Sequence, residues 1–199
     1  MASNYRNQLE AYLKNLHVDA QYVLDVGGAQ LPVRDRVASW NVREYRIMDL
    51  DQPHAGAPRP DIVCDLNTYR GLTLDLERPM MPYDLVFCLE VMDYVYDPMN
   101  ALGILRRMMV SGGRLIISFP FNYPVHQPVN ADALRYTPQA ALRLMEATGF
   151  SVKNVVYRRM LEDSKKPYDT FLRTEEMHPA KHYPDHDVLG CIIEAIAGP

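Results

Sequence analysis

The sequence predicts a doubly wound α/β fold, in which a mostly parallel sheet of seven strands has helices on both faces. Three observations carry this prediction. Short apolar runs alternate with segments of helical periodicity along the 199 residues. Several of these runs are apolar at consecutive positions, as strands are when both faces of a sheet are covered. Turn residues separate the runs, so each run has the length of a strand and none has the length of a membrane span.

Seven apolar runs are the predicted strands. They cover residues 22–26, 45–50, 61–66, 83–89, 113–121, 151–157 and 188–197. The runs near residues 85, 115 and 190 do not alternate between apolar and polar positions, which indicates that they lie inside the sheet.

Three segments have the periodicity and end signals of helices. The first carries an apolar stripe over residues 5–16, with Ser3 or Asn4 available as the N-cap. The other two begin with a capping residue followed by proline and end with glycine, at residues 97–113 and 137–149.

Length and charge limit the classes of protein that this chain can be. A chain of 199 residues buries a full core without metal or disulfide support, so we expect one domain over residues 1–199. Residues 158–187 are rich in charge, proline and histidine and are expected to form an excursion between the last two strands. The 21 basic and 25 acidic side chains give a net charge of −4, which argues against a nucleic-acid partner.

Cysteine usage and the N-terminal segment indicate a cytoplasmic protein. Cys64, Cys88 and Cys191 are an odd, widely spaced set, and each lies in an apolar run where a buried thiol is expected. The first residues carry charges every few positions and lack the apolar core of a signal peptide, so neither secretion nor a membrane partner is expected.

Acidic residues end four successive predicted strands. They are Asp25, Asp49, Asp65 and Glu90. One aspartate at a strand end is common because aspartate favours turns. Ligands of open α/β sheets bind beyond the carboxyl ends of the strands, so four acids there predict a ligand with hydroxyls, an amino group and positive charge.

Two glycines and a spaced acid refine this prediction. Gly27 and Gly28 follow Asp25 and let a ligand approach the backbone without meeting a Cβ atom. Asp49 comes 22 residues after Gly27, the spacing at which an acid accepts hydrogen bonds from both ribose hydroxyls, and Asp51 is the reserve candidate.

With these residues in order, the sequence resembles the class I S-adenosylmethionine-dependent methyltransferases, in particular the small type-11-like bacterial group. The resemblance covers about residues 20–157. Residues 23–28 are similar to the family's first motif, residues 62–66 to its adenine-side motif and residues 83–95 to its fourth-strand signature. The paired glycines before the fifth strand stand at 112–113, and the segments at 126–128 and 135–138 are similar to those of members that act on sugars and other small acceptors.

The resemblance implies a Rossmann-like fold and transfer of a methyl group from S-adenosylmethionine to oxygen or nitrogen of a small-molecule acceptor. It implies an N-terminal helix over 1–18, a cofactor-binding half over 20–120 and an acceptor-side half over 121–199. The implied cofactor-binding residues are Asp25, Gly27, Gly28, Asp49, Asp65, Leu66, Cys88 and Leu89.

The acceptor side has fewer candidates. His126 is the expected general base because its ordinary pKa suits proton transfer, although a structural histidine fits the sequence equally well. Tyr94, Tyr123 and Arg135 are the expected acceptor-binding residues, and a salt bridge between Arg135 and Asp132 is slightly favoured over acceptor binding. Residues 122–136 are expected to form a lid or acceptor wall.

Departures from the family pattern leave two alternatives open. Ala29 and Leu31 stand where the pattern has glycine, and a leucine at the expected helix start narrows the gap over the ligand. One alternative is a methyltransferase-like protein without activity that serves as a partner or scaffold, and the other is a different nucleotide-binding enzyme. A dinucleotide fingerprint is disfavoured because it needs glycine at positions 29 and 32.

No metal site is expected. Three histidines at positions 178, 182 and 186 have the spacing of a ligand stripe on a helix, but Pro179 and Pro184 interrupt that helix. The sequence leaves the oligomeric state open, with a homodimer among the options.

Overall fold

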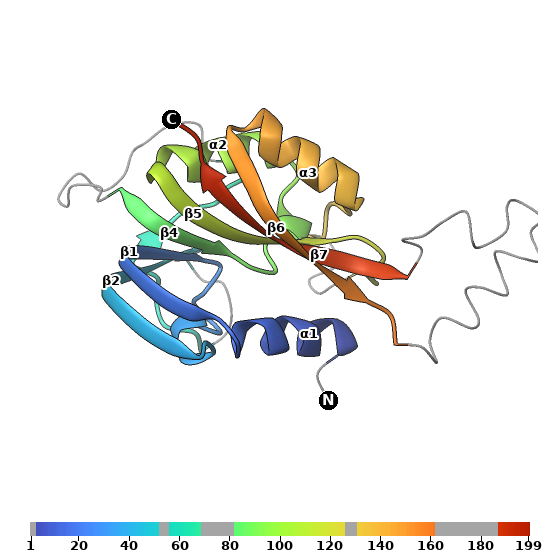
Figure 1. The fold of residues 1–199 in the computed structure, drawn as a ribbon, viewed down its shortest axis with the longest axis horizontal. Coiled ribbons are helices and arrows are strands. Elements are labelled where there is room, and N and C mark those ends of the chain that lie inside the picture. The colour runs from blue at the N-terminus through green and yellow to red at the C-terminus, as the bar shows by residue number, and fades with distance from the viewer. Residues whose placement is uncertain (1–2, 52–55, 69–81, 126–130, 162–186) are drawn as a thin grey trace, which may run out of the picture.

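A computed structural model of the chain describes residues 3–51, 56–68, 82–125, 131–161 and 187–199. These residues form one seven-stranded sheet with three α-helices (Figure 1). The helices are α1 (Asn4–Leu13), α2 (Pro98–Arg107) and α3 (Pro138–Ala147). The strands are β1 (His17–Val26), β2 (Ser39–Asp49), β3 (Ile62–Val63), β4 (Tyr83–Cys88), β5 (Met109–Pro120), β6 (Phe150–Arg159) and β7 (Val188–Ala197).

The strand order confirms a doubly wound, mostly parallel sheet. The order is β3-β2-β1-β4-β5-β7-β6, and the chain reverses its direction of travel through the sheet between β1 and β4. All pairs from β3 to β5 are parallel, whereas β7 runs antiparallel to both β5 and β6. Each of the seven predicted strands is present. The carboxyl ends of β1, β2 and β4 therefore lie together at one edge, where α/β sheets bind their ligands.

Each face of the sheet has its own apolar core, which explains the continuous apolar runs of the inner strands. The helices α2 and α3 cover one face and α1 covers the other (Figure 1). Leu102 and Leu105 of α2 pack in the first core, and Leu9 and Leu13 of α1 pack in the second. Neighbouring residues of one strand point to opposite faces, so both faces need apolar side chains.

Capping residues set the helix starts as predicted. The side chains of Ser3, Asp97 and Thr137 each accept a hydrogen bond from a backbone N–H in the first turn of α1, α2 and α3, respectively. The predicted end of the second helix is wrong. The helix α2 ends at Arg107, and Gly113 lies inside β5 next to the register shift between β4 and β5.

The connection between β1 and β2 also corrects an expectation, because no helix starts at Leu31. Residues 27–38 contain only a 3-10 turn, Val33–Asp35. The register pairs His17 with Ser39 and Val26 with Met48, so this connection must return along the length of β1, about 30 Å at 3.3 Å per residue. Twelve residues in a helix would advance only about 18 Å, so the connection has to be largely extended.

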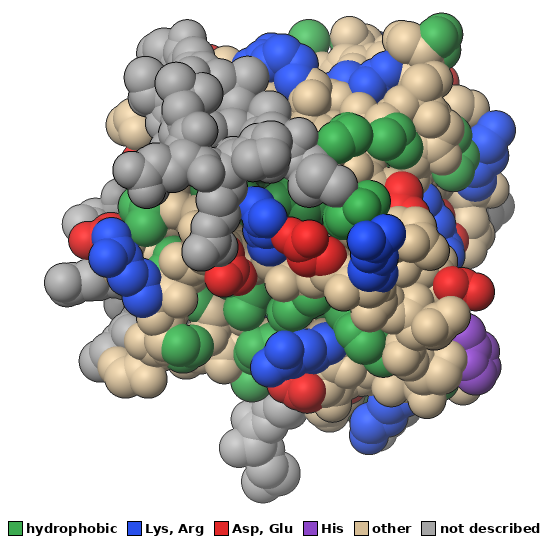
Figure 2. Space-filling model, turned by 90° about the vertical axis from the view of Figure 1, so that its left-hand side faces the viewer, with side chains coloured by type: hydrophobic (Ala, Val, Ile, Leu, Met, Phe, Trp, Pro, Cys, Tyr) green, Lys and Arg blue, Asp and Glu red, His purple; other side chains and the backbone are tan. Residues whose placement is uncertain are grey.

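The opposite edge of the sheet, where the parallel strands begin, carries acidic and basic side chains interspersed with apolar ones (Figure 2). Among the described residues, no helix is both long and apolar enough to span a membrane. Most of the predicted excursion over residues 158–187 lies outside the described residues.

We predict that Leu102→Ala lowers the free energy of unfolding by about 2–5 kcal/mol, because it removes a fully buried side chain from the centre of α2 and leaves a cavity. Met99→Ala is the matched control on the same helix, since Met99 is 46% exposed, and it should change stability by roughly 0.5 kcal/mol or less. Urea denaturation measures both values. Equal effects of the two substitutions would contradict the packing described for α2.

Candidate functional site

Two adjoining cavities open at the carboxyl ends of the strands. The smaller, about 330 Å³, lies over the ends of β2 and β3, and the larger, about 410 Å³, lies between the end of β1, the segment after β4 and the start of α1. Three residues, Gly27, Glu90 and Tyr94, line both cavities. Each volume is within the range of small-molecule sites.

The smaller cavity combines two carboxylates with apolar walls. The Asp49 carboxylate accepts hydrogen bonds from the backbone N–H of Ala29 at 3.1 Å and of Leu50 at 2.8 Å. These bonds hold it against the glycine turn. Asp65 accepts a bond from the N–H of Asn67 through Oδ1. Leu66 contributes an apolar surface, together with other lining residues such as Met48, Leu50 and Val91.

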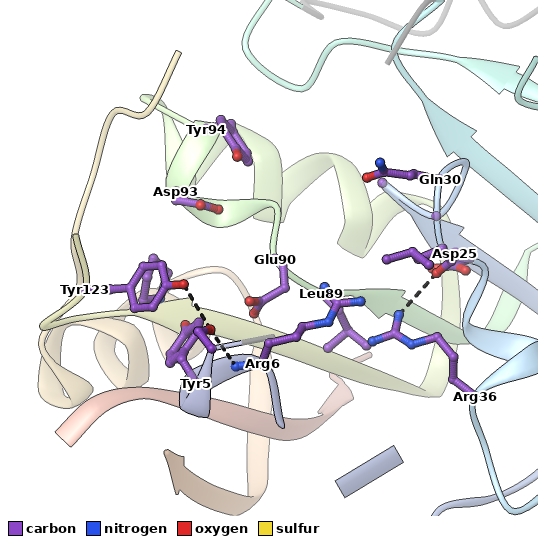
Figure 3. Close-up of a pocket in the computed structure, with 15 residues that line it drawn as sticks. Tyr5, Arg6, Asp25, Gln30, Arg36, Leu89, Glu90, Asp93, Tyr94 and Tyr123 are labelled. Carbon is purple, nitrogen blue, oxygen red and sulfur yellow. Dashed lines mark hydrogen bonds between the residues drawn. The ribbon is translucent and has the colours of Figure 1, made fainter. Parts of the chain in front are cut away.

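The larger cavity is lined by residues from four parts of the chain (Figure 3). Asp25 and Gln30 lie on one side, and Tyr5 and Tyr123 lie on the other, with Glu90 between them (Figure 3). The rings of Tyr5 and Tyr123 pack with their centroids 4.4 Å apart. The other lining residues include Ser3, Arg6, Leu31, Arg36, Leu89, Asp93 and Tyr94.

Asp25 is a buried carboxylate that holds the extended connection in place. Its Oδ2 accepts hydrogen bonds from the backbone N–H of Val33 at 2.8 Å and from the Tyr45 hydroxyl at 2.5 Å. Burial raises the pKa of Asp25 to about 6, although both hydrogen bonds oppose the rise. A Cβ atom on Gly28 would lie 2.3 Å from this carboxylate, so the position of the Asp25 side chain leaves room only for glycine at residue 28.

Glu90 is held in a strained backbone conformation by a second buried cluster. Among the described residues, Glu90 is the only non-glycine residue with a positive φ, which is 57°. Its Oε1 accepts a hydrogen bond from Ser118 Oγ at 2.9 Å and forms an ion pair with Nη1 of the fully buried Arg158 at 2.8 Å. The Arg158 guanidinium lies over the Tyr5 ring, 3.4 Å from its centroid, and donates to the Tyr5 hydroxyl.

A pair of arginines lines the larger cavity. Arg6 of α1 and Arg36 of the β1–β2 connection both bind Glu10, at 2.7 and 2.8 Å. Partial burial opposes ionisation of Glu10, but the hydrogen bonds from Arg36 and Arg6 dominate and lower its pKa. The side chain of Arg6 extends from α1 toward Leu89 (Figure 3).

The structure brings together nine of the residues expected to form the site. They are Asp25, Gly27, Gly28, Asp49, Asp65, Leu66, Leu89, Tyr94 and Tyr123, each of which lines one or both cavities. Cys88 does not join them, because it is fully buried in the core at the end of β4. His126 and the histidines at 178, 182 and 186 lie outside the described residues.

Arg135 holds the segment after β5 and lines neither of the two cavities. It forms the expected salt bridge with Asp132, at 2.5 Å, and donates to the backbone carbonyls of Tyr123 and Pro124. In this way it fixes the start of the predicted wall over residues 122–136. Two further tyrosines of this region lie outside the site: Tyr136 is buried and donates to backbone carbonyls, and Tyr96 is 60% exposed.

Sequence reasoning missed four residues of the site: Tyr5, Arg6, Arg36 and Arg158. On the sequence, Tyr5 belongs to an ordinary apolar stripe, and Arg6 and Arg36 occupy ordinary polar positions. Arg158 was assigned to the excursion expected over residues 158–187, one position after the predicted strand over 151–157, whereas the structure places it inside β6.

Solved structures with the same architecture include several methyltransferases. An S-adenosylmethionine-dependent methyltransferase from Archaeoglobus fulgidus matches with a TM-score of 0.59 and 14% identity, over 97% of this chain and 92% of that one. One from Mesorhizobium loti matches with a TM-score of 0.58 and 14% identity, over 98% of each chain. The [4+2]-cyclase SpnF matches with a TM-score of 0.55 and 14% identity, over 98% of this chain and 81% of that one.

No protein-family model and no curated protein matches the sequence. At identities of 14%, the solved structures show the fold alone. The strand order, the antiparallel β7 and these matches together confirm the predicted class I methyltransferase fold.

We predict a pH dependence of stability that comes from Asp25. Its pKa is about 6 in the folded protein and near 3.8 when unperturbed. The folded state therefore retains a proton that the unfolded chain loses. This contribution to stability is fully present below about pH 4 and is lost as the pH rises through 6, at about 1.4 kcal/mol per pKa unit.

Urea denaturation between pH 4 and 7 measures this effect in the wild type and in Asp25→Asn. The wild type should lose stability relative to Asp25→Asn as the pH rises, whereas the exposed control Asp19→Asn should follow the wild type. A constant difference between the wild type and Asp25→Asn across this range would contradict the assignment.

Proposed function

We propose that this protein is an S-adenosylmethionine-dependent methyltransferase that acts on a small-molecule acceptor, at oxygen or nitrogen. The observation that carries the proposal is the pair of cavities that meet at the Gly27 turn, one with a carboxylate at the end of β2 and the other with space for a second molecule. The fold shared with methyltransferases supports it.

The smaller cavity suits the adenosine part of the cofactor. Asp49 would accept hydrogen bonds from the ribose hydroxyls, since its carboxylate lies next to the glycine turn, beside which the ribose would be placed. Asp65 retains Oδ2 as an acceptor for the exocyclic amine, because its bond to Asn67 uses Oδ1. Leu66 and Val91 would pack against the adenine ring.

The larger cavity suits the amino-acid part of the cofactor next to an acceptor. Gly27 and Gly28 give access to the backbone there, and Asp25 provides negative charge for an ammonium group. Arg6 would bind the carboxylate end. The N-terminus of a helix often binds such an anionic group. The extended β1–β2 connection contains no α-helix, so we assign this role to Arg6 instead.

When bound, S-adenosylmethionine supplies a methyl group on a positively charged sulfur. The protein's contribution is then alignment, because an in-line displacement needs the acceptor held at attack distance. Tyr5, Tyr94 and Tyr123 form the wall against which an acceptor would lie, and Arg135 fixes the position of Tyr123. His126 stays the predicted proton acceptor for an acceptor that must lose a proton.

A second candidate function is that of a methyltransferase-like protein without activity, which has lost cofactor binding and serves as a partner or scaffold. Leu31 favours it, because this half-exposed side chain lines the larger cavity at the position where the methyltransferase pattern has glycine. A methyl-transfer assay against pools of small amines and hydroxyl compounds separates the two, since a scaffold protein would transfer no methyl group.

We also propose a cytoplasmic location. All three cysteines are free, and Cys88 and Cys191 are buried as reduced thiols, which is what a reducing compartment permits. The proposed partner is the small-molecule acceptor, and the oligomeric state stays open.

The cofactor assignment is tested by calorimetric titration with S-adenosylmethionine, S-adenosylhomocysteine and NAD. We predict that the first two bind and that NAD does not. Asp49→Ala should weaken binding of both by roughly tenfold or more, because a charge-assisted hydrogen bond to the ribose is lost.

Asp51→Ala is the matched control, since Asp51 is an exposed acid two residues away that lines neither cavity. It should leave the affinity unchanged. A loss of affinity in Asp51→Ala with none in Asp49→Ala would transfer the ribose role to Asp51, and no binding of either ligand would contradict the proposed function.

A further inference from the structure

We propose that Glu90 is the anionic partner of the sulfonium, so that its charge makes the protein prefer S-adenosylmethionine over the neutral product S-adenosylhomocysteine. The inference rests on the proposed function, because it assigns a residue to the charged centre of that ligand. It concerns selection between two bound species and goes beyond the assignment of the cavities.

Glu90 lies where the two cavities meet. The sulfur of S-adenosylmethionine joins the adenosine part to the amino-acid part, so it has to lie where the two cavities meet. Only Gly27, Glu90 and Tyr94 line both cavities among the described residues, and Glu90 is the charged member of this set. Asp49 lines the smaller cavity alone and Asp25 the larger alone.

The described contacts of the Glu90 carboxylate involve only one of its two oxygens. Within the described residues, the hydrogen bond from Ser118 and the ion pair with Arg158 both reach Oε1. Oε2 is thereby left for a ligand, and a quarter of the side chain is exposed.

The backbone of Glu90 has an unusual conformation. A non-glycine residue at a φ of 57° is disfavoured and persists only where the surroundings impose it. Here the backbone N–H of Glu90 donates to Ser118 Oγ at 2.8 Å, and the same hydroxyl donates to the carboxylate. The strain and both bonds together aim the side chain at the junction of the cavities.

Tyr94 completes the surroundings of the proposed sulfonium position. Burial raises its pKa to about 12, so the phenol is neutral and its ring can face a cation without adding a competing charge. A cation between Glu90 and Tyr94 would be attracted both by the carboxylate and by the face of the aromatic ring. The neutral thioether left after methyl transfer loses the attraction of Glu90, which favours release of the product.

Calorimetric affinities for S-adenosylmethionine and S-adenosylhomocysteine, in the wild type and in Glu90→Gln, test the proposal without any acceptor. The wild type should bind S-adenosylmethionine more tightly. Glu90→Gln should reduce the ratio of the two affinities by roughly tenfold, the effect of one charge-assisted contact, mainly through weaker binding of the sulfonium. Asp65→Asn is the control, because it removes a charge from the adenine side and should weaken both ligands alike, leaving the ratio unchanged.

Glu90→Gln leaves Arg158 without its anion, so its melting temperature is measured alongside. If the variant is unfolded, the double variant Glu90→Gln with Arg158→Met removes both buried charges and takes its place. An unchanged affinity ratio in a folded variant that binds both ligands overturns the role of Glu90 and leaves the proposed function standing. Failure of the wild type to bind either ligand overturns the proposed function itself.

Discussion

The ion pair between Arg158 and Glu90 is the interaction on which the site depends. A guanidinium with no exposed surface needs an anion, and breaking such a pair by removing one partner costs about 3–5 kcal/mol. Arg158 comes from β6, Glu90 follows β4, Ser118 belongs to β5 and Tyr5 to α1. One buried charge therefore joins β5, β6, the segment after β4 and the N-terminal helix beside the larger cavity. The carboxylate that we propose for the sulfonium is thus also a structural one.

Tyr5 extends this cluster to the surface of the site. Its ring contacts Arg158 on one side and Tyr123 on the other, and the hydroxyl of Tyr123 is within 3.2 Å of Ser3 Oγ, the N-cap of α1. The start of α1 is thus attached both to the buried ion pair and to the segment after β5. The wall proposed for the acceptor and the carboxylate proposed for the sulfonium are held by the same set of contacts.

The length of the β1–β2 connection is the second constraint. Twelve residues that must return along a ten-residue strand cannot form a helix, so the N-terminal anion site that a helix would give is lost. The carboxylate of Asp25 accepts the backbone N–H of Val33 and fixes the extended path, and Arg6 and Arg36 bring positive charge to the cavity.

The sequence was sufficient for features that depend on local patterns. Apolar runs gave all seven strands, and the capping residues Ser3, Asp97 and Thr137 gave the helix starts. The acids at the strand ends met at one edge because parallel strands end together. The 97–113 helix was predicted too long because glycine occurs at irregularities inside strands, as Gly113 does in β5, as well as at helix ends.

Features that depend on distant contacts could not be read from the sequence. Arg158 and Glu90 are 68 positions apart, and no local pattern pairs them. Cys88 was expected at the ligand from the resemblance to the methyltransferases, but it ends a central strand and is fully buried in the core. The missing helix after β1 was not predictable either, because the predicted strands over 22–26 and 45–50 left 18 residues between them, and only the longer β1 and β2 of the structure shorten the connection to twelve.

A crystal structure of the protein with S-adenosylhomocysteine tests the account most directly. We predict adenosine in the smaller cavity, the amino-acid end in the larger one, and the thioether sulfur at their junction beside the Glu90 carboxylate. Density for the ligand elsewhere on the molecule, or a sulfur that lies away from Glu90 and Tyr94, would contradict it.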